Sequence, residues 1–271
     1  MTKKETLETA MVYSLLGRLD ETRPFLSERP FRQIDKQASR AAILGGGVQP
    51  LPGEVSLANN GVLFLDELPE FSRTALEVLR QPIEDGSITI SRAGQKCTYP
   101  CSIMVVAAMN PCPCGYYGDP TRKCTCSEQK IKRYLNRISG PLLDRFDIHV
   151  EVPAVKFEEL RDTSSAECSA DIKKRADRAR EIQRERFKGS KTTCNAKINA
   201  EQFEKVCVID KEAEKTLKDA FESLGLTARA YDRVLKVART IADLDESEII
   251  RSEHVLEAVQ YRSLDRKYWA K

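Results

Sequence analysis

The sequence lacks features that would mark a membrane, secreted or strongly charged protein. None of its apolar runs approaches the ~20 residues that a helix needs to cross a bilayer. The segment "MTKKETLETAMVYSLLG" carries charges and has no continuous apolar core, which excludes a signal peptide. The net charge of +3 over 271 residues is too small to identify a nucleic-acid-binding protein by itself. We therefore expect a cytoplasmic globular protein with no membrane partner.

Nine cysteines are many for a cytoplasmic chain, and four of them cluster. Cys112, Cys114, Cys124 and Cys126 form the pattern C-x-C, nine residues, C-x-C. In a reducing compartment this pattern favours a metal over disulfides. Four thiolates suit a structural Zn²⁺ ion, since they leave no coordination position open for catalysis. The alternative is four reduced thiols in a flexible loop. The other five cysteines are interpreted as packing residues.

The first half of the sequence predicts short apolar strands separated by helices. We expect strands at Gly61–Asp66, in "IMVVAAMN" and in "IHVEVP", a β-hairpin at 86–101, and helices at 4–17, in "FSRTALEVLRQP", near 127–138 and in "GPLLDRF". Ser72 is expected to cap the second helix and Pro82 to end it. This alternation predicts an α/β fold with a mostly parallel sheet.

After Pro153 the strand signals end and helical patterns dominate. We predict an α/β core at 1–154 with a cysteine-rich loop at 110–127, a helical linker at 155–192 and an all-helical domain at 193–271.

Polar residues follow two of the predicted strands. The adjacent carboxylates Asp66 and Glu67 end one strand, and Asn110 ends another. In parallel sheets, ligands bind at the carboxyl ends of strands. In nucleoside triphosphate hydrolysis, one carboxylate holds Mg²⁺, a second polarises water, and an amide positions that water. The alternative for Asp66 and Glu67 is a solvated helix start.

Several linked motifs resemble the magnesium-chelatase-like branch of the AAA+ ATPases, of the ComM/YifB type. They are "GEVSLANNGVLFLDELPEF", "ALEVLRQPIEDGSITISRA", "AAMNPCPCGYYGD", "ISGPLLDRFDIHVEVP" and "TARAYDRVLKVARTIADL", in this order over nearly the whole chain. The resemblance implies a ring, of the hexameric kind, that uses ATP and Mg²⁺. It implies a P-loop NTPase core, here partial, and a helical lid.

The resemblance also implies roles for single residues. Asp66 and Glu67 would be the Walker B pair, with Asp66 holding Mg-ATP, and Asn110 the sensor-1 residue. Arg145 would be the arginine finger that reaches the ATP of a neighbouring subunit, and Arg229 the sensor-2 arginine that contacts nucleotide. The alternatives are local ion pairs, of Arg145 with Asp144 or Asp147, and of Arg229 with Asp232.

One expected motif is missing from the sequence. The phosphate-binding loop, G-x-x-x-x-G-K-[ST], occurs nowhere in the 271 residues. In the family it precedes the segment matching "ETLETAMVYSLLG", and its strand lies between the sensor-1 strand and the strand matching "IHVEVP". We therefore expect a sheet without its central strand and negligible ATP hydrolysis by this chain alone. Two explanations of the missing loop stay open. A separate upstream polypeptide carries it, or the chain is a truncated gene product.

A second departure lies in "RPFRQIDKQAS". Members of the family carry the sequence "APHH" where this chain has Gln33, Ile34, Asp35 and Lys36. The role of that histidine pair is therefore in doubt here.

Basic residues are concentrated in two predicted helices. The first set is Lys130, Lys132, Arg133 and Arg137, and the second is Lys173, Lys174, Arg175, Arg178, Arg180, Arg184, Arg186, Lys188 and Lys191. Composition favours solvated helix surfaces with internal ion pairs. The resemblance instead implies a motor that translocates on DNA and promotes branch migration. The alternatives are a chelatase-type motor that remodels a partner enzyme and a non-enzymatic binding or assembly module.

Overall fold

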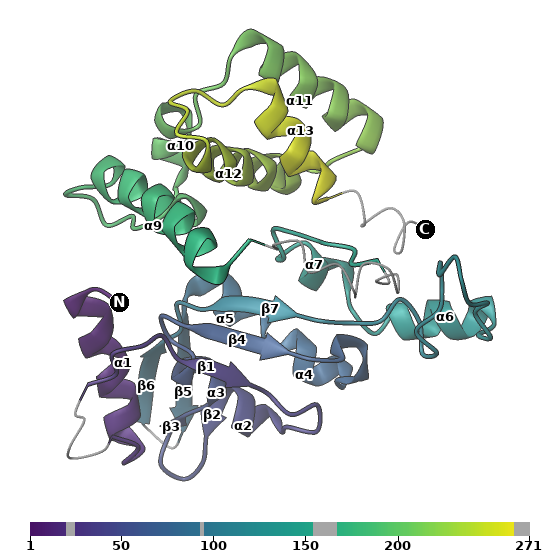
Figure 1. The fold of residues 1–271 in the computed structure, drawn as a ribbon. Helices are drawn as coiled ribbons and strands as arrows, with labels where there is room; N and C mark the ends of the chain where they lie inside the picture. The colour runs from purple at the N-terminus through teal and green to yellow at the C-terminus, as the bar shows by residue number, and fades with distance from the viewer. Residues whose placement is uncertain (20–24, 93–94, 154–166, 263–271) are drawn as a thin grey trace. The chain divides into compact units, whose positions relative to one another are not determined.

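A computed structural model describes residues 1–19, 25–92, 95–153 and 167–262 of the chain (Figure 1). The chain divides into two compact units, Met1–Phe146 and Asp147–Lys271. The predicted connecting helix belongs to the second unit. Within the described residues, no helix is both long and apolar enough to cross a membrane.

A three-stranded parallel sheet organises the first unit. Its strands are β1 (Phe31–Gln33), β4 (Val62–Leu65) and β7 (Met104–Ala107), in the order β1-β4-β7. Phe31 lies opposite Val62, and Leu65 lies opposite Ala107. The predicted strands at 61–66 and in "IMVVAAMN" are thereby confirmed as parallel neighbours. A second pairing, between β2 (Gly45–Gly46) and β3 (Leu51–Pro52), is antiparallel.

The first unit also contains several short helices. They are α1 (Lys3–Leu15), α2 (Arg40–Leu44), α3 (Glu54–Leu57), α4 (Arg73–Glu77), α5 (Arg80–Asp85), α6 (Glu128–Leu135) and α7 (Gly140–Leu143), with a 3-10 turn η1 at Leu68–Glu70. Ser72 caps α4 as predicted, because its hydroxyl accepts a hydrogen bond from the Ala75 N–H. The prediction that Pro82 ends this helix is wrong. Pro82 lies in the first turn of α5, where a missing N–H is tolerated.

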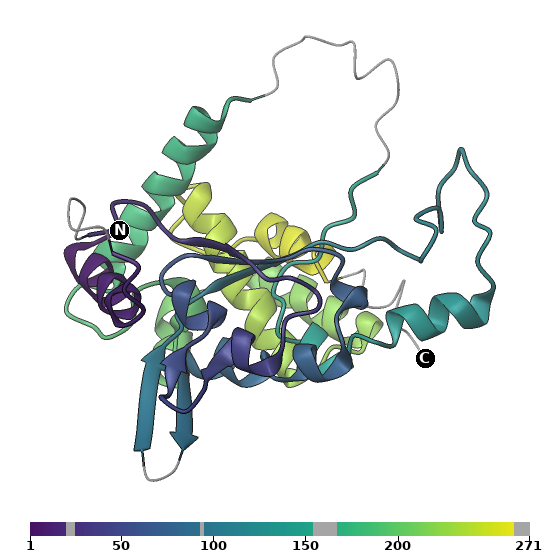
Figure 2. The same cartoon turned by 90° about the horizontal axis from the view of Figure 1, so that it is seen from below.

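The predicted β-hairpin is confirmed. β5 (Ser87–Arg92) and β6 (Gln95–Pro100) pair antiparallel, with Ile90 opposite Cys97. Residues 93–94, between the two strands, lie outside the described residues. Both views show this pair extending away from the parallel sheet (Figures 1 and 2).

The two faces of the parallel sheet differ in exposure. Leu63 and Leu65, which share one face, are fully buried. On the other face, Phe31 is 62% exposed and Met104 is 63% exposed. Helices on both sides normally cover a parallel sheet. Among the described residues of the first unit, therefore, no helix fully covers one face of this sheet.

The predicted strand in "IHVEVP" is wrong. Residues 147–153 contain no strand, and Ile148, Val150 and Val152 are 50%, 63% and 82% exposed. A strand needs a neighbour for its backbone hydrogen bonds. Among the described residues this segment has no strand beside it, so its alternating pattern produces no sheet pairing.

In the described part of the second unit the regular elements are helices, apart from one isolated bridge between Ile209 and Ile250. Its helices are α9 (Ser169–Arg186), α10 (Ala200–Val206), α11 (Lys211–Leu224), α12 (Ala228–Leu244) and α13 (Ser252–Gln260), with a 3-10 turn η2 at Asn195–Lys197. Asp210 and Thr227 cap α11 and α12, and Gly225 ends α11 in the left-handed conformation. Leu217, Val234, Leu235 and Val255 lie in its core.

A buried polar network joins α9 to α12. Arg186 donates two hydrogen bonds to Asp243, of 2.8 and 2.5 Å. The Arg239 guanidinium, 1% exposed, also bonds Asp243. Asn195 Nδ2 donates to the same carboxylate over 2.7 Å. These contacts hold the basic helix α9 against the core of the second unit.

The junction of β1 and β4 depends on Gly61. A Cβ at this position would lie 2.1 Å from the carbonyl oxygen of Pro30, which accepts the Val62 N–H over 2.8 Å. The Gly61 carbonyl also accepts the Met104 N–H, at 2.9 Å, so this residue contacts both neighbouring strands.

We expect Gly61→Ala to destabilise the first unit by about 1–3 kcal/mol, because the added methyl forces β1 away from β4. Thermal and urea unfolding followed by circular dichroism measure this. Gly140→Ala is the matched control, since a Cβ at Gly140 meets no atom within 4 Å. Equal stability of the two variants would contradict the expectation.

Candidate nucleotide and metal sites

The polar residues that follow β4 and β7 lie at one edge of the sheet. Leu65 and Ala107 are register partners, so Asp66 and Glu67 leave the sheet beside the segment leading to Asn110. The Ala108 N–H donates to the Leu65 carbonyl over 2.9 Å, and the Leu68 N–H donates to the Ala108 carbonyl over 3.0 Å. Asp66, Glu67 and Asn110 are all solvent-exposed. This is the edge where parallel sheets bind ligands.

Glu67 has an unusual backbone. Its φ of 51° and ψ of 47° place it in the left-handed region, which a non-glycine residue rarely adopts. The Asp66 carboxylate accepts the Glu67 N–H over 2.9 Å and supports this turn. Such backbone strain concentrates at functional sites. It turns the chain sharply after the strand, so that the two adjacent carboxylates do not continue the strand.

Lys36 contacts the second carboxylate. Its Nζ lies 2.5 Å from Glu67 Oε2, and this hydrogen bond raises the pKa of Lys36. Lys36 follows β1, which pairs in parallel with β4, so the ends of both strands meet. The sequence singled out Lys36 as a departure from the family pattern without connecting it to Glu67. The parallel pairing of β1 with β4 is the signal that would have connected Lys36 with Glu67.

Arg145 is held by its own chain. Its guanidinium bonds the carboxylate of Glu84 and the carbonyls of Arg80, at 3.1 Å, and Pro141, at 2.5 Å. The side chain is 11% exposed. The ion pair described for Arg145 is therefore with Glu84 of α5.

Arg229 belongs to the second unit. It is the second residue of α12 and is exposed. No ion pair to Asp232 is found in the part of the chain that the structure describes. In the next turn of the helix, Arg233 bonds Asp147 over 2.8 Å. The first unit therefore contains Asp66, Glu67, Asn110 and Arg145, and the second contains Arg229.

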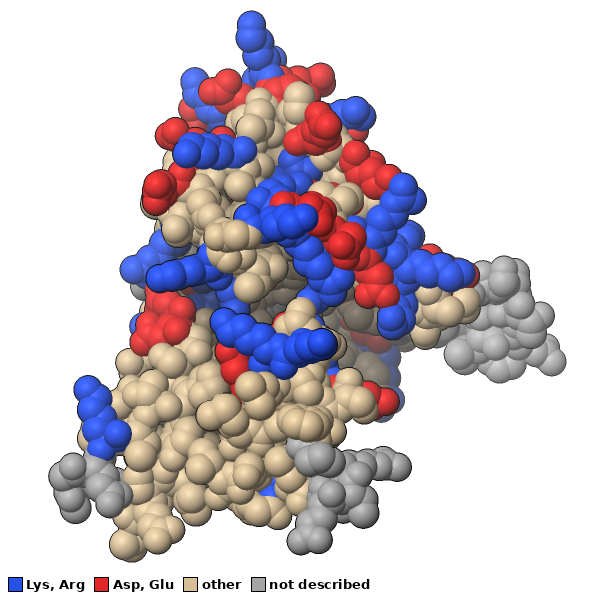
Figure 3. All heavy atoms as spheres, turned by 90° about the vertical axis from the view of Figure 1, so that its left-hand side faces the viewer, with Lys and Arg blue, Asp and Glu red and all other residues tan. Residues whose placement is uncertain are grey.

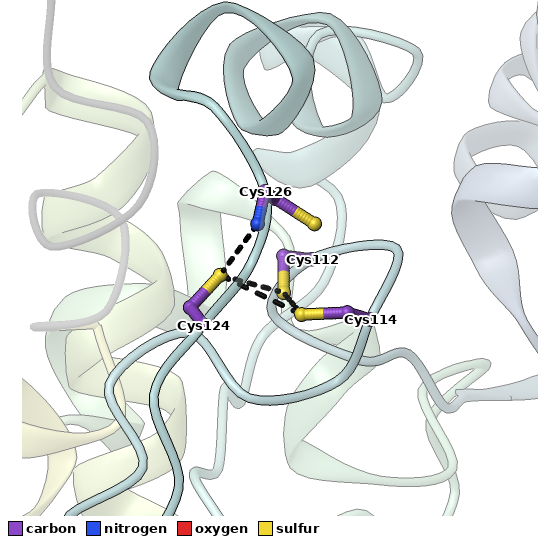
Figure 4. Close-up of side chains that lie close together, drawn as sticks. All are labelled: Cys112, Cys114, Cys124 and Cys126. Carbon is purple, nitrogen blue, oxygen red and sulfur yellow. Dashed lines mark hydrogen bonds between the residues drawn. The ribbon is translucent and has the colours of Figure 1, made fainter.

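The four clustered cysteines converge in the loop between β7 and α6 (Figure 4). Their sulfur atoms all lie within 4.8 Å of one another. The Sγ atoms of Cys112 and Cys114 are 3.4 Å apart, and Cys124 lies 3.7 and 3.5 Å from these two. Tetrahedral zinc, with Zn–S bonds of about 2.3 Å, separates its sulfurs by roughly 3.8 Å. The four sulfurs thus fit a single zinc ion.

Backbone N–H groups make one thiol of this cluster acidic. Hydrogen bonds from Tyr116 and Thr125 lower the pKa of Cys114 to about 5. The Cys126 N–H bonds Cys124, but desolvation and the neighbouring thiols outweigh it and raise the pKa of Cys124 to about 12. The cluster therefore favours a thiolate at Cys114 beside a protonated Cys124, and a divalent cation would stabilise further thiolates.

The basic residues of α9 are mostly neutralised locally. Ion pairs join Lys173 to Asp177, Lys174 to Asp171, Arg175 to Glu167, Arg178 to Glu246, Arg184 to Glu181 and Lys188 to Glu185. Figure 3 shows basic and acidic side chains interspersed on the face that it draws. The local contacts agree with the solvated-surface alternative for this helix.

The basic residues of α6 differ from those of α9 in their ion pairing. Lys130, Lys132 and Arg133 are exposed, and no ion pair of theirs is found within the described ranges. Arg137, just after the helix, bonds Glu70 over 3.1 Å and the Pro69 carbonyl over 2.8 Å. Three cations for which the described residues supply no ion pair therefore lie on α6, after the cysteine loop.

Comparisons with known proteins agree with this architecture. The family described as "Magnesium chelatase, subunit ChlI" matches residues 1–160, and the family of its C-terminal region matches residues 166–262. The chain is 46% identical over 267 residues to the competence protein ComM of Haemophilus influenzae, and 45% identical over 267 residues to the uncharacterized protein YifB of Salmonella typhimurium. Each match covers 98% of this chain and 51% of the relative.

A more distant match is the maternal DNA replication licensing factor mcm6 of Xenopus tropicalis, 24% identical over 224 residues, or 78% of this chain and 25% of that protein. The chain spans about half the length of the YifB and ComM proteins that it matches. By its motifs, its α/β and helical units and these matches, the chain belongs to the magnesium-chelatase-like family of AAA+ ATPases, in the group that includes YifB and ComM.

Proposed function

We propose that this chain supplies the magnesium-binding and water-activating part of a nucleotide site in a ring-forming, DNA-translocating ATPase that promotes branch migration. The observation that carries the proposal is the parallel pairing of β4 with β7, which brings Asp66, Glu67 and Asn110 to one sheet edge. In this assignment Asp66 holds the Mg²⁺ of ATP, Glu67 polarises the attacking water, and Asn110 orients it. Arg145 of a neighbouring subunit and Arg229 stabilise the phosphate charge.

Lys36 influences this chemistry directly. With its Nζ 2.5 Å from Glu67, Lys36 holds the residue assigned to water activation in a resting arrangement. Both side chains are about half exposed, so the pair is weak in water and separates readily when Mg-ATP binds.

The missing phosphate-binding loop supports a second candidate. A chain without G-x-x-x-x-G-K-[ST] lacks the backbone cradle and the lysine that hold the β- and γ-phosphates. By itself it acts as a non-enzymatic binding or assembly module. Nothing in the geometry of the first unit favours the remodelling of a partner enzyme over action on DNA.

We place DNA contacts on α6 rather than on α9. Phosphate contacts require cations that are not already neutralised, and each contact releases counterions. The exposed Lys130, Lys132 and Arg133 meet this condition better than the ion-paired residues of α9. Arg133 lies one turn from Lys130, so both project on the same flank of the helix.

We also propose that the cysteine cluster holds structural zinc. The loop has little core of its own, and a tetrathiolate ion would fix the segment that joins Asn110 to α6. The same ion would therefore brace both the sensor-1 position and the basic helix.

The first prediction concerns ATP hydrolysis. The chain alone should hydrolyse ATP negligibly, whereas a fusion with the part of Haemophilus influenzae ComM outside the matched region should hydrolyse it. In that fusion, Glu67→Gln should lower kcat about 100-fold or more while ATP binding remains, because it removes the base. Glu70→Gln, which changes a nearby carboxylate of similar exposure, is the control. Equal rates for both variants would refute the assignment.

The second prediction concerns DNA. For the same fusion, Lys130→Ala with Arg133→Ala should weaken binding to a random-sequence duplex and reduce the slope of log affinity against log salt by about 2. The matched pair Lys173→Ala with Lys174→Ala should change neither quantity. Fluorescence anisotropy at several salt concentrations measures both. A larger effect from the α9 pair would move the contact to that helix.

The third prediction concerns zinc. Elemental analysis of the purified chain should find one zinc per chain, and Cys124→Ser should lose it. Cys168→Ser, at an exposed cysteine outside the cluster, should retain it. Removal by a chelator should also lower the thermal stability of the first unit. A metal-free protein after purification with added zinc would exclude the site.

A further inference from the structure

Arg137 contacts the turn that follows the two candidate carboxylates. Its Nη1 atom donates to the Pro69 carbonyl over 2.8 Å and to Glu70 Oε2 over 3.1 Å. Both acceptors belong to the 3-10 turn η1, and Glu67 is the residue from which this turn begins. An arginine far along the chain thus holds the segment attached to the residue assigned to water activation.

This turn needs support because Glu67 has a left-handed backbone. A non-glycine residue keeps such a conformation only where the surrounding structure holds it there. Within the turn, the Glu70 N–H donates to the Glu67 carbonyl over 2.7 Å. From outside, the Ala108 carbonyl accepts the Leu68 N–H at the start of η1, and Arg137 bonds its end. The conformation of Glu67 therefore depends on contacts at both ends of the turn.

The contact with Pro69 is the stronger of the two that Arg137 makes. Carbonyls at the end of a helical turn lack a partner within the turn, and arginine side chains can supply one. Pro69 is buried, and in the part of the chain that the structure describes its carbonyl accepts one hydrogen bond, from Arg137. The pair with Glu70 is weaker, since both side chains are more than 40% exposed. Glu70→Gln keeps an acceptor oxygen and leaves the contact with Pro69 in place.

The end of α6 fixes the backbone of Arg137. The Arg137 N–H donates to the Tyr134 carbonyl over 3.3 Å, and the buried Leu135 and Ile138 lie on either side of it in the sequence. Tyr134 is buried as well, and this burial, followed by the charge of Glu70, raises the pKa of its hydroxyl to about 12. The last turn of α6 therefore packs close to η1, and the Arg137 side chain extends from a fixed position.

We propose that Arg137 is a positioning residue for Glu67. It holds the end of η1, and η1 in turn keeps Glu67 in the left-handed conformation that directs its carboxylate away from the strand. Arg137 itself contacts neither the nucleotide nor the attacking water. This inference rests on the role given to Glu67 in the proposed function, but the hold on the turn can be measured without ATP.

The first experiment measures the turn in the chain alone, by hydrogen exchange followed by NMR. Arg137→Met keeps the apolar stem of the side chain and removes its donors. It should speed exchange of the Leu68 amide at least tenfold, whereas the Ala108 amide, which donates to Leu65, should change less than twofold. Arg137→Lys, which keeps a cationic donor, should restore slow exchange.

Arg73→Met is the matched control for this variant. Arg73 is exposed at the start of α4, and no contact of its side chain with η1 is found among the described residues. The same chemical change at this position should alter neither amide.

The second experiment measures ATP hydrolysis in the ComM fusion. Arg137→Met should lower kcat about tenfold and change KM for ATP less than twofold, with Arg137→Lys between this variant and the unaltered fusion. In a fusion that already carries Glu67→Gln, Arg137→Met should lower kcat less than twofold. A residue that acts through Glu67 has nothing left to position once that base is removed.

Three results would overturn the proposal. They are unchanged exchange of the Leu68 amide in Arg137→Met, an equal fractional loss of kcat with and without Glu67→Gln, and a raised KM with unchanged kcat. The last result would make Arg137 a nucleotide contact. If Glu67→Gln itself leaves kcat unchanged, the proposed function fails, and the exchange measurement still decides whether Arg137 holds the turn.

Discussion

The candidate site depends on the parallel pairing of β4 with β7. The register of Leu65 with Ala107 fixes where each strand ends, and therefore where Asp66, Glu67 and Asn110 leave the sheet. Two hydrogen bonds beyond the strands, from Ala108 to Leu65 and from Leu68 to Ala108, extend this alignment into the loops. A shift of one residue would turn the buried leucines outward and separate the polar residues. The core and the site thus require the same register.

Local patterns in the sequence predicted what local interactions determine. The strands at 61–66 and in "IMVVAAMN", the hairpin, the cap of α4 and the cysteine spacing depend on residues close together in the chain. The strand predicted in "IHVEVP" failed because a strand also needs a neighbour, which alternation cannot supply. Pro82 was misread because its effect depends on its position within the helix.

Ion pairs between residues far apart in the sequence were harder to predict than these local features. The contact between Lys36 and Glu67 spans 31 residues, and that between Arg145 and Glu84 spans 61. Neither follows from a motif, because each requires knowing which elements pack together. The pairs within α9 were foreseeable, since Lys173 with Asp177 and Lys174 with Asp171 lie one turn apart. The helices α6 and α9 are both rich in basic residues. The structure distinguishes them by the acidic residues that lie beside the cations of α9.

The contacts of Arg145 bear on how a ring of such chains would work. A side chain that is 11% exposed and bonded to Glu84 and two carbonyls is not free to reach another subunit. To act as an arginine finger it must exchange these partners for phosphate oxygens, which suit its planar, forked guanidinium equally well. When Arg145 leaves Glu84, the Glu84 carboxylate is 55% exposed and readily hydrated. Loss of this ion pair therefore costs little free energy at Glu84. The proposed role in a neighbouring site therefore requires Arg145 to leave Glu84 when subunits meet, so the proposal makes hydrolysis depend on this exchange of partners.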